Sequence, residues 1–336
     1  MSKAESWAQR HQVVLFFALT YALSWASWAP YLLTRAEASQ ALLPVGIFGP
    51  ALCCIIVSRV AGPGPRGGDR RGGRIAFAVT WMAAGLAFLF HVRSNAGPPL
   101  PVAIILSAVF GVVPAYVVSS AFSRMPGVRR SLRSLVAPPG RLGWYLAAIL
   151  IVPADRLVSV RLARELGWGF LSHGARAGGV LDLVPVIAVS FGYTLIFAGG
   201  LNEESGWTGF ALPRLQARYS PMIASVILWA LWMVWHVPLQ VTGMWNPNLQ
   251  SLTHALVGTF FARFIFTWLY NGSKGGVWTA VLLHTSANVT SEVVPISWAS
   301  PVVEGALALI VIVGARMWQR VPAGSDVAYG GGEQAA

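Results

Sequence analysis

The chain has 336 residues, of which 55% are hydrophobic and only 11% are charged. Its long apolar runs are too many to fold into one soluble core, so the composition excludes a soluble protein. The formal net charge is +12, an excess of arginine that can indicate either a nucleic-acid partner or a membrane topology signal. Because the basic residues lie in short loops between apolar stretches, we interpret them as topology signals and expect no nucleic-acid partner.

The apolar stretches are each close to the ~20 residues that a helix needs to cross ~30 Å of hydrocarbon. They predict an all-α fold, a polytopic transmembrane helical bundle of about 8 to 10 spans in a lipid bilayer. Pro153, Asp155 and Arg156 interrupt one of these spans. The candidate spans, in chain order, are 13–33, 42–60, 75–92, 100–122, 143–160, 180–212, 221–240, 251–270, 275–295 and 299–318.

The two halves of the chain differ in kind. Up to about residue 180 the apolar spans carry few ionisable residues, whereas the later spans carry several. We therefore expect transmembrane scaffold helices in residues 1–180 and a helical core that carries the chemistry in residues 181–320. Residues 321–336 have too little apolar content to fold and predict a disordered cytoplasmic tail.

The basic loops give the orientation of the chain. Arginines cluster in residues 66–74 and again in 124–141. The positive-inside rule places both loops in the cytoplasm, and counting spans from there places both termini on the same side. The membrane that we expect is the bacterial cytoplasmic membrane. The segment with Arg161, Arg164 and Arg176 falls on the outer side in this count and disagrees with the rule.

Two adjacent carboxylates, Glu203 and Glu204, lie in an apolar stretch that reads as a helix which Pro213 ends or kinks. An ionisable group in the hydrocarbon layer is unfavourable, so such groups usually face a polar cavity and mark function. Adjacent residues on a helix point ~100° apart, so one carboxylate can face a cavity while the other has a structural partner. The alternative is a pair at the cytoplasmic water boundary.

Three more polar residues lie in the following apolar spans. His236 ends a tryptophan-rich span, where the alternative is a structural histidine beside an interfacial tryptophan belt. His284 and Asn288 are four residues apart, so they lie on one helix face and can point at one place. The alternative for this pair is interhelical hydrogen bonding that only holds the bundle together.

Together these residues are suited to hydrolysis. A carboxylate can take a proton from water, while imidazole and carboxamide groups hold a metal, the water or an oxyanion. At ~1.5 Å per residue, Glu203 lies ~15 Å from Pro213 and His284 ~15 Å from Lys274, which puts both near the middle of the membrane. His236 is ~22 Å from the start of its span and needs a tilted helix. We expect all of these groups around one cavity that water can enter.

The residues form three ordered motifs that resemble those of the CAAX prenyl-protease and bacteriocin-processing family of intramembrane proteases. The resemblance covers about residues 195–295. The motifs in this chain are Glu203-Glu204-x-x-Trp207-x-Gly209-Phe210 with Pro213 and Leu215, then Trp232-x-x-x-His236 followed by Pro238, then His284-x-x-x-Asn288.

The resemblance implies an intramembrane endopeptidase that acts on a membrane-associated peptide or protein. It implies that Glu203, beside Glu204, is the general base and that His236 helps to hold the water or a metal. It implies that His284 and Asn288 stabilise the oxyanion. A divalent metal such as zinc stays open, with Glu203, His236 and His284 as its candidate ligands.

The chain departs from the family pattern at Thr208. The first motif of the family usually runs Glu-Glu-x-x-x-Arg, and Thr208 takes the place of the arginine. Its loss removes a partner of Glu204 or a contact for an anionic substrate group, so activity itself is in question. Arg263, ~16 Å from Lys274 along its helix, lies at a depth where it could substitute. The alternative for Arg263 is a structural or snorkelling role. Trp232 stands where phenylalanine is usual.

Two other functions are compatible with parts of this pattern. Thr208 suggests a non-catalytic membrane protein of the same fold, such as a bacteriocin-immunity or scaffolding protein. A proton-coupled transporter would use the same buried groups. The transporter is disfavoured because the first half of the chain has no matching polar sites and no visible internal repeat.

Overall fold

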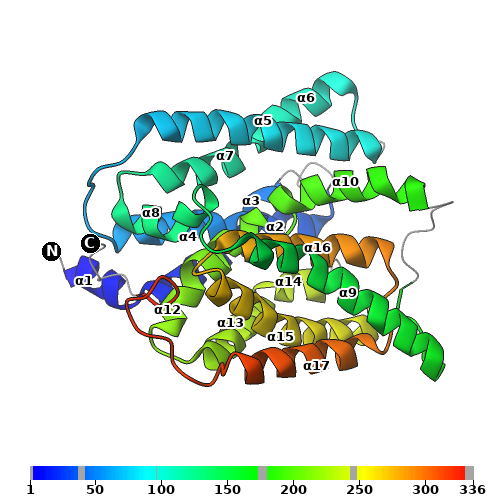
Figure 1. Cartoon of the computed structure of the whole chain (residues 1–336). Helices are drawn as coiled ribbons and strands as arrows, with labels where there is room; N and C mark the ends of the chain where they lie inside the picture. Colours follow the sequence, from blue (N-terminus) through cyan, green and yellow to red (C-terminus); the bar gives the residue numbers. More distant parts are fainter. Residues whose placement is uncertain (1–2, 37–41, 96, 173–179, 243–247, 330–336) are drawn as a thin grey trace.

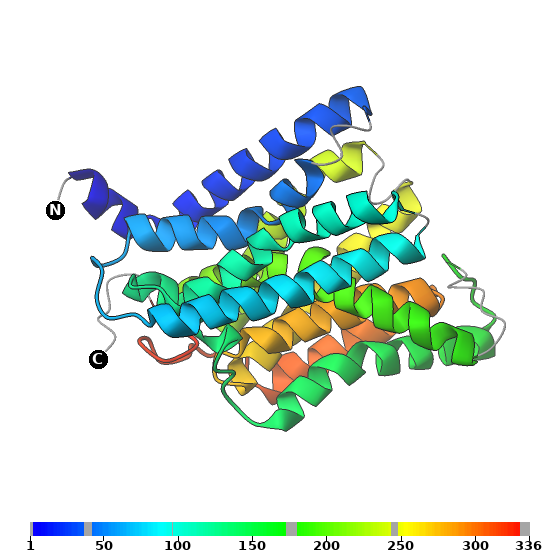
Figure 2. The ribbon, with the colours of Figure 1, turned by 90° about the horizontal axis from the view of Figure 1, so that it is seen from above.

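The computed structural model describes residues 3–36, 42–95, 97–172, 180–242 and 248–329. These residues form helices and turns, with no β-strand among them. Most of the long helices run side by side in the same or opposite directions, so that their ends gather at two opposite faces (Figures 1 and 2). The prediction of an all-α, polytopic helical bundle is confirmed.

The helices follow the predicted spans closely. They are α1 (Lys3–Arg10), α2 (Gln12–Thr34), α3 (Leu43–Ile47), α4 (Gly49–Val60), α5 (Arg70–Ser94), α6 (Leu100–Phe110), α7 (Val112–Ser119), η2 (Ser120–Phe122), α8 (Pro126–Leu132), η3 (Arg133–Leu135), α9 (Leu142–Leu166), α10 (Val180–Phe197), α11 (Leu201–Gly206), the π-helical turn η4 (Trp207–Ala211), α12 (Leu212–Gln216), α13 (Pro221–Trp235), α14 (Val237–Val241), α15 (Leu249–Gly272), α16 (Val277–Val293) and α17 (Ser300–Gly314).

Five helical segments in the described part of the chain are long and apolar enough to cross a membrane. They are Gln12–Thr34, Arg70–Ser94, Leu100–Phe122, Leu181–Gln216 and Leu249–Gly272. Shorter apolar helices, α4, α13 and α17, lie among them. Helix α9 continues through Pro153, so the interruption foreseen there does not break the helix.

The outer surface of the bundle is suited to lipid. On α5 a stripe of large apolar side chains is exposed at helical spacing, formed by Ile75, Val79, Met82, Leu86 and Phe90. An apolar stripe of this length is unfavourable in water but not against acyl chains. Together with the apolar helices, this surface is that of an integral membrane protein.

The starts of α5, α13 and α15 carry side-chain caps. Asp69 accepts the backbone N–H groups of Arg71 and Gly72 at the start of α5. Ser220 precedes Pro221 at the start of α13, and Asn248 caps α15. Such side chains satisfy backbone donors that the first turn of a helix leaves without partners. The ends of these spans are therefore fixed locally by the sequence.

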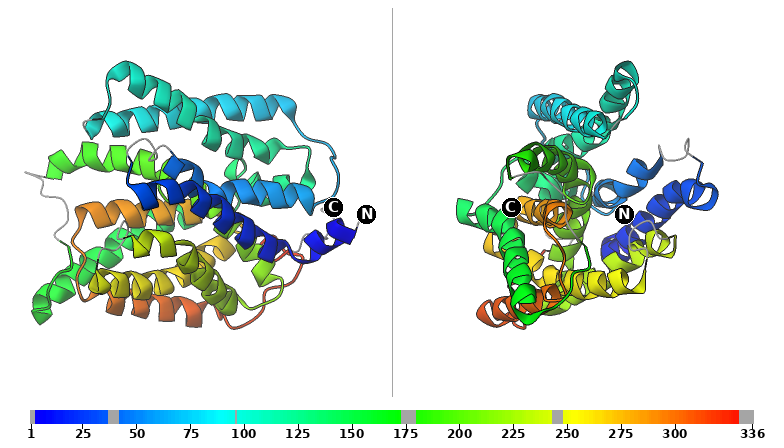
Figure 3. Two further views of the ribbon diagram at one scale, coloured as in Figure 1. Left: turned by 180° about the vertical axis from the view of Figure 1, so that it is seen from behind. Right: turned by 90° about the vertical axis from the view of Figure 1, so that its right-hand side faces the viewer.

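Helix α16 lies near the centre of the bundle and contacts α9, α10, α11 and α15 (Figure 3). Helix α11, which carries both glutamates, packs against α4 and α16. Helix α4 in turn packs against α2. An element of the first half of the chain, α4, thus contacts the acidic helix directly, and the expected scaffold is also part of the wall of the site.

The C-terminal segment differs from the expected disordered tail. Tyr329 is only 4% exposed, and its backbone N–H donates to the carbonyl of Pro213. Gln216 donates to the carbonyl of Val327. The segment ending at Tyr329 therefore packs at the same end of the molecule as α1 (Figure 1). Ala328 and Tyr329 are both buried, so this segment has apolar side chains that pack against the bundle. Residues 330–336 of the expected tail lie outside the described residues.

Candidate active site

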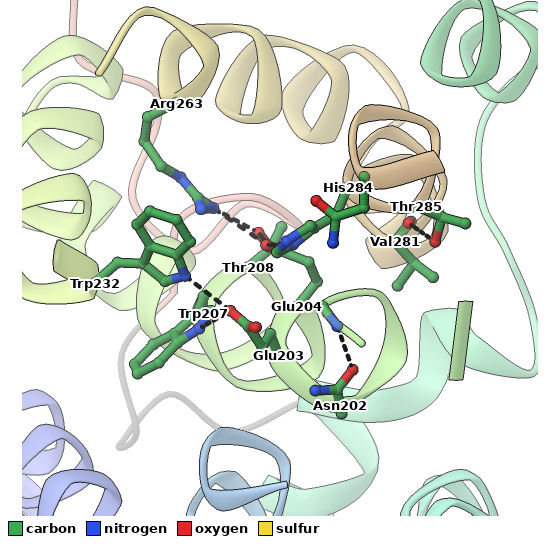
Figure 4. Close-up of polar contacts among 12 residues, drawn as sticks. Asn202, Glu203, Glu204, Trp207, Thr208, Trp232, Arg263, Val281, His284 and Thr285 are labelled. Atoms are coloured by element: carbon green, nitrogen blue, oxygen red, sulfur yellow. Dashed lines mark hydrogen bonds and ion pairs between the residues drawn. The ribbon is translucent and has the colours of Figure 1, made fainter. Parts of the chain in front are cut away.

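Glu203 lies between two indole rings. Its Oε2 accepts the Nε1–H of Trp207 at 3.2 Å, one turn along the same helical segment, and that of Trp232 on α13 at 2.8 Å (Figure 4). The side chain is 6% exposed. The alternative of a carboxylate pair in water at the boundary is therefore wrong. Two neutral donors hold the carboxylate without supplying a positive charge, so it keeps its basic character.

Glu204 points in another direction and has different partners. Its Oε1 lies 3.0 Å from Nδ1 of His284 on α16, and its Oε2 lies 3.3 Å from the guanidinium of Arg263 on α15. The hydroxyl of Thr208 also donates to Oε2. Glu204 is completely buried. The prediction that adjacent helical carboxylates have separate environments is confirmed.

Thr208 and Arg263 lie together beside Glu204. A guanidinium nitrogen of Arg263 donates to the Thr208 hydroxyl at 2.9 Å, and the same nitrogen is the one close to Glu204 (Figure 4). Arg263 is 5% exposed, and its guanidinium also lies over the ring of Phe266 at 4.6 Å. It does not snorkel to the membrane surface. A cation from α15 thus reaches the carboxylate next to the position where the family motif carries arginine.

His236 directly follows α13, where the helix gives way to α14. Its Nδ1 lies 3.0 Å from the carbonyl of Trp232. A carbonyl oxygen only accepts, so Nδ1 carries the proton and Nε2 carries the lone pair of the neutral ring. The imidazole packs edge-on against Trp232 and Trp235 and is 6% exposed. These contacts fix the plane of the ring.

His284 and Asn288 border the loop between α10 and α11. Asn288 donates to the carbonyl of Ala198 at 2.9 Å. Gly199 follows in a left-handed conformation (φ 107°), and a side chain there would lie 2.5 Å from Nε2 of His284. Its N–H donates to Oδ1 of Asn202 at 2.9 Å, which closes the loop. Glycine is required here because of both the backbone conformation and the space.

One cavity of about 270 Å³ brings these groups together. All five predicted site residues line it, namely Glu203, Glu204, His236, His284 and Asn288. The rest of its wall is mostly apolar and includes Trp28 of α2, Ile47 of α3, Trp229, Leu239 and Phe266. A few polar groups that converge in an apolar cavity are typical of a ligand or active site.

The donors do not form a ready metal site. Among the residues that the structure describes, no group of three histidine, cysteine, aspartate or glutamate side chains is arranged to hold a metal ion. Of the three candidate ligands, His284 turns its Nδ1 to Glu204, and Glu203 turns Oε2 to two indoles. These side chains are therefore not arranged around a common metal position.

The sequence did not indicate the roles of two residues of the site, Trp207 and Gly199. Trp207 stood in the first motif, but nothing in the sequence indicated that its indole would donate to Glu203. Gly199 had no signal at all, although it lies against His284. Both roles depend on how α10, α11 and α16 pack, which a linear pattern does not encode.

Comparisons with known proteins agree with this site. A family model described as type II CAAX prenyl endopeptidase Rce1-like matches residues 185–290. A CAAX prenyl protease 2 from Methanococcus maripaludis is 29% identical over 173 residues, which is 48% of this chain. The match spans 60% of the length of that relative. Both matches agree with the family that the three motifs resemble. Residues 185–290 of this chain are thus similar to the type II CAAX prenyl endopeptidase family.

Proposed function

We propose that this protein is an intramembrane endopeptidase in which Glu203 activates water to hydrolyse a peptide bond of a membrane-associated substrate. The observation that carries the proposal is the single cavity lined by a carboxylate, two imidazoles and a carboxamide within an apolar wall. The match to an endopeptidase family supports the reaction class.

In this proposal, Glu203 and His236 activate the water molecule. The carboxylate accepts a proton from a water molecule as that water attacks the substrate carbonyl carbon. The neutral ring of His236 presents Nε2 as an acceptor, which orients the second hydrogen of the same water. Glu203 then delivers its proton to the leaving amine. Each group acts only by holding or moving a proton, so these reaction steps need no further cofactor.

In this proposal, His284 and Asn288 stabilise the oxyanion. The Nδ1–H of His284 is held by Glu204 at 3.0 Å, which favours an imidazolium whose Nε2–H donates to the oxyanion. Asn288 uses one amide hydrogen on Ala198 and has a second for the same oxyanion. Glu204 is thus a positioning residue, and it explains why the motif carries two adjacent carboxylates.

Arg263 is the positioning residue that we assign to the place left by the motif arginine. Its contacts to Glu204 and Thr208 supply the buried carboxylate with a cation. Without a cation, a buried carboxylate would take up a proton, and its hold on His284 would weaken. Arginine at position 208 is then not needed for activity.

The substrate that we propose carries an apolar group beside the scissile bond. The curated relative is named for CAAX prenyl substrates. In this chain the aromatic wall of the cavity, with Trp28, Trp229 and Trp235, suits an apolar group of similar bulk. Comparing the membrane proteomes of cells with wild-type protein and with a Glu203 variant would identify the cleaved protein.

The decisive test is cleavage by the full-length protein in membranes. Glu203→Ala and His284→Ala should each lower the rate by about 100-fold or more, the usual contribution of a general base or an oxyanion donor. Glu165→Gln is a matched control because this glutamate is exposed and pairs with Arg161 in a surface contact. Full cleavage by both site variants would contradict the proposal.

Thr208 is also compatible with a second function. The chain would then be a non-catalytic membrane protein of the same fold with an immunity or scaffolding role. The two functions differ in what Glu203→Ala does in cells. An unchanged cellular phenotype with this variant at normal abundance would favour the non-catalytic function, whereas its loss favours the peptidase.

A further inference from the structure

A second cavity, of about 770 Å³, lies away from the candidate active site, at the end of the molecule where α1, α8 and the C-terminal segment gather (Figure 1). Its walls come from α8, η3, the turn between α15 and α16, and the segment ending at Tyr329. The side chains that line it include four cations and one carboxylate: Arg129, Arg130, Arg133, Lys274 and Asp326. The cavity is therefore strongly positive.

The cavity lies at the level where the helices leave the apolar layer. Trp144 and Tyr145 are in the first turn of α9, and Trp278 is in the first turn of α16. The indole of Trp278 donates to the carbonyl of Leu135 at 2.9 Å. Tryptophan and tyrosine of this kind mark the headgroup level of a membrane. Pro139, which accepts the Tyr145 hydroxyl, lines the cavity itself.

Position, charge and size together indicate the ligand. Basic cavities between membrane helices at headgroup level attract anionic lipids, and arginine matches the geometry of phosphate oxygens. A volume of about 770 Å³ is ample for a phosphate-bearing headgroup. We propose that this cavity binds the phosphate group of an anionic membrane lipid. Free inorganic phosphate carries the same recognised chemistry, and the experiment below separates the two sources.

The cavity also has a direct connection to the helix of the glutamates. Tyr329 forms part of its wall, and the guanidinium of Arg130 lies over the Tyr329 ring at 4.0 Å. The Tyr329 hydroxyl donates to the carbonyl of Gly209 at 3.4 Å, within the π-helical turn that follows Glu204. A phosphate that binds Arg130 is therefore linked, through the Tyr329 ring, to this turn.

The test is lipid binding by the full-length protein in detergent micelles, which does not depend on peptidase activity. We expect phosphatidylglycerol, but not phosphatidylcholine, to stay bound in native mass spectrometry. In the variant Arg133→Gln/Lys274→Gln the apparent affinity should fall about 30-fold, at the usual contribution of a basic residue near a lipid phosphate. Both side chains are exposed, so their substitution leaves the fold intact.

The matched control is Arg141→Gln/Arg320→Gln. It removes the same charge from two exposed residues that do not line the cavity, and should change the affinity less than threefold. Equal losses in both variants, or equal binding of the two lipids, would overturn the proposal. Displacement of phosphatidylglycerol by inorganic phosphate shows that the phosphate group alone is recognised. Binding that resists phosphate assigns the site to the intact lipid.

Discussion

The pair formed by Thr208 and Arg263 shows how a charge can be kept while its position in the sequence changes. Arg263 reaches Glu204 from α15, and Thr208 accepts a hydrogen bond from the same guanidinium nitrogen that approaches the carboxylate. A small hydroxyl at position 208 leaves the volume that this guanidinium fills. The two residues are therefore expected to depend on one another.

Arg263→Met tests that dependence. Methionine is similar in length but leaves Glu204 buried without a cation, so the folded state should lose about 3–5 kcal/mol. Cleavage should fall with it, and adding Thr208→Arg to the variant should recover part of both. Thermal unfolding of the purified protein and a peptide cleavage assay measure the two effects. Wild-type stability and activity in Arg263→Met would contradict the assigned role.

Gly199→Ala tests the approach of the loop to His284. A methyl group there would lie 2.5 Å from Nε2 of His284, and the φ of 107° is unfavourable for alanine. Displacing the imidazole by a fraction of an ångström should lower cleavage by about 100-fold. Gly143→Ala is a suitable control, since a methyl group at that position meets open space. Equal rates in the two variants would show that the loop does not position His284.

At the scale of the element, the π-helical turn η4 has an identifiable cause. Pro213 has no N–H to donate to the carbonyl of Gly209 four residues earlier, and its ring crowds that carbonyl. The chain widens instead, and Leu212 donates to Trp207, five residues back. The Gly209 carbonyl then accepts the Tyr329 hydroxyl. The expected kink at Pro213 thus appears as a π-helical turn beside the glutamates, and such turns are frequent at functional sites.

Pro213→Ala should restore an ordinary α-helix through this segment. The regained hydrogen bond favours the folded state by about 1 kcal/mol, whereas closing the wide turn rotates Glu203 and Glu204 relative to α12. We expect an unchanged or higher melting temperature together with at least about tenfold slower cleavage. Unfolding and cleavage measured on one preparation separate these effects. A variant with the wild-type rate would show that the turn does not set the position of the glutamates.

At the scale of the whole molecule, the orientation in the membrane stays a prediction from the basic residues. Helix α1, the segment ending at Tyr329 and the basic loop before α5 lie at one end of the bundle (Figures 1 and 2). From the positive-inside rule we expect this end to face the cytoplasm. Arg161 and Glu165 form an exposed ion pair near the other end of α9, and the same prediction places them outside. Arg161 and Arg164 still disagree with the rule, which counts lysine and arginine rather than net charge.

Cysteine labelling in intact cells tests this orientation. Cys53 and Cys54 are buried and should not react with a membrane-impermeant maleimide, so single cysteines can be added to the native background. We expect Glu165→Cys to be labelled in intact cells and Arg141→Cys only after permeabilisation, because the two residues lie near opposite ends of α9. The reverse pattern would invert the topology.

The fold class and the list of site residues followed from the sequence. Runs of about 20 apolar residues predict membrane helices because a bilayer requires each backbone polar group to be satisfied within the helix. Isolated polar residues in such runs are conspicuous because burying them in lipid is unfavourable. The 100° step between helical neighbours already separated the environments of Glu203 and Glu204. The catalytic roles of these residues stay predictions that the experiments above address.

Only the tertiary structure decided which groups meet. The contacts of Glu204 with Arg263 and His284 join segments 59 and 80 residues apart in the chain, and Tyr329 reaches Gly209 from 120 residues away. The sequence predicted a disordered tail in residues 321–336 because low apolar content is a local property that it displays directly. Whether a segment packs depends on a surface that the rest of the chain provides, here the carbonyl that Pro213 leaves without a partner. Local periodicity determines the helices of this protein, and the distant packing of side chains between them determines the site.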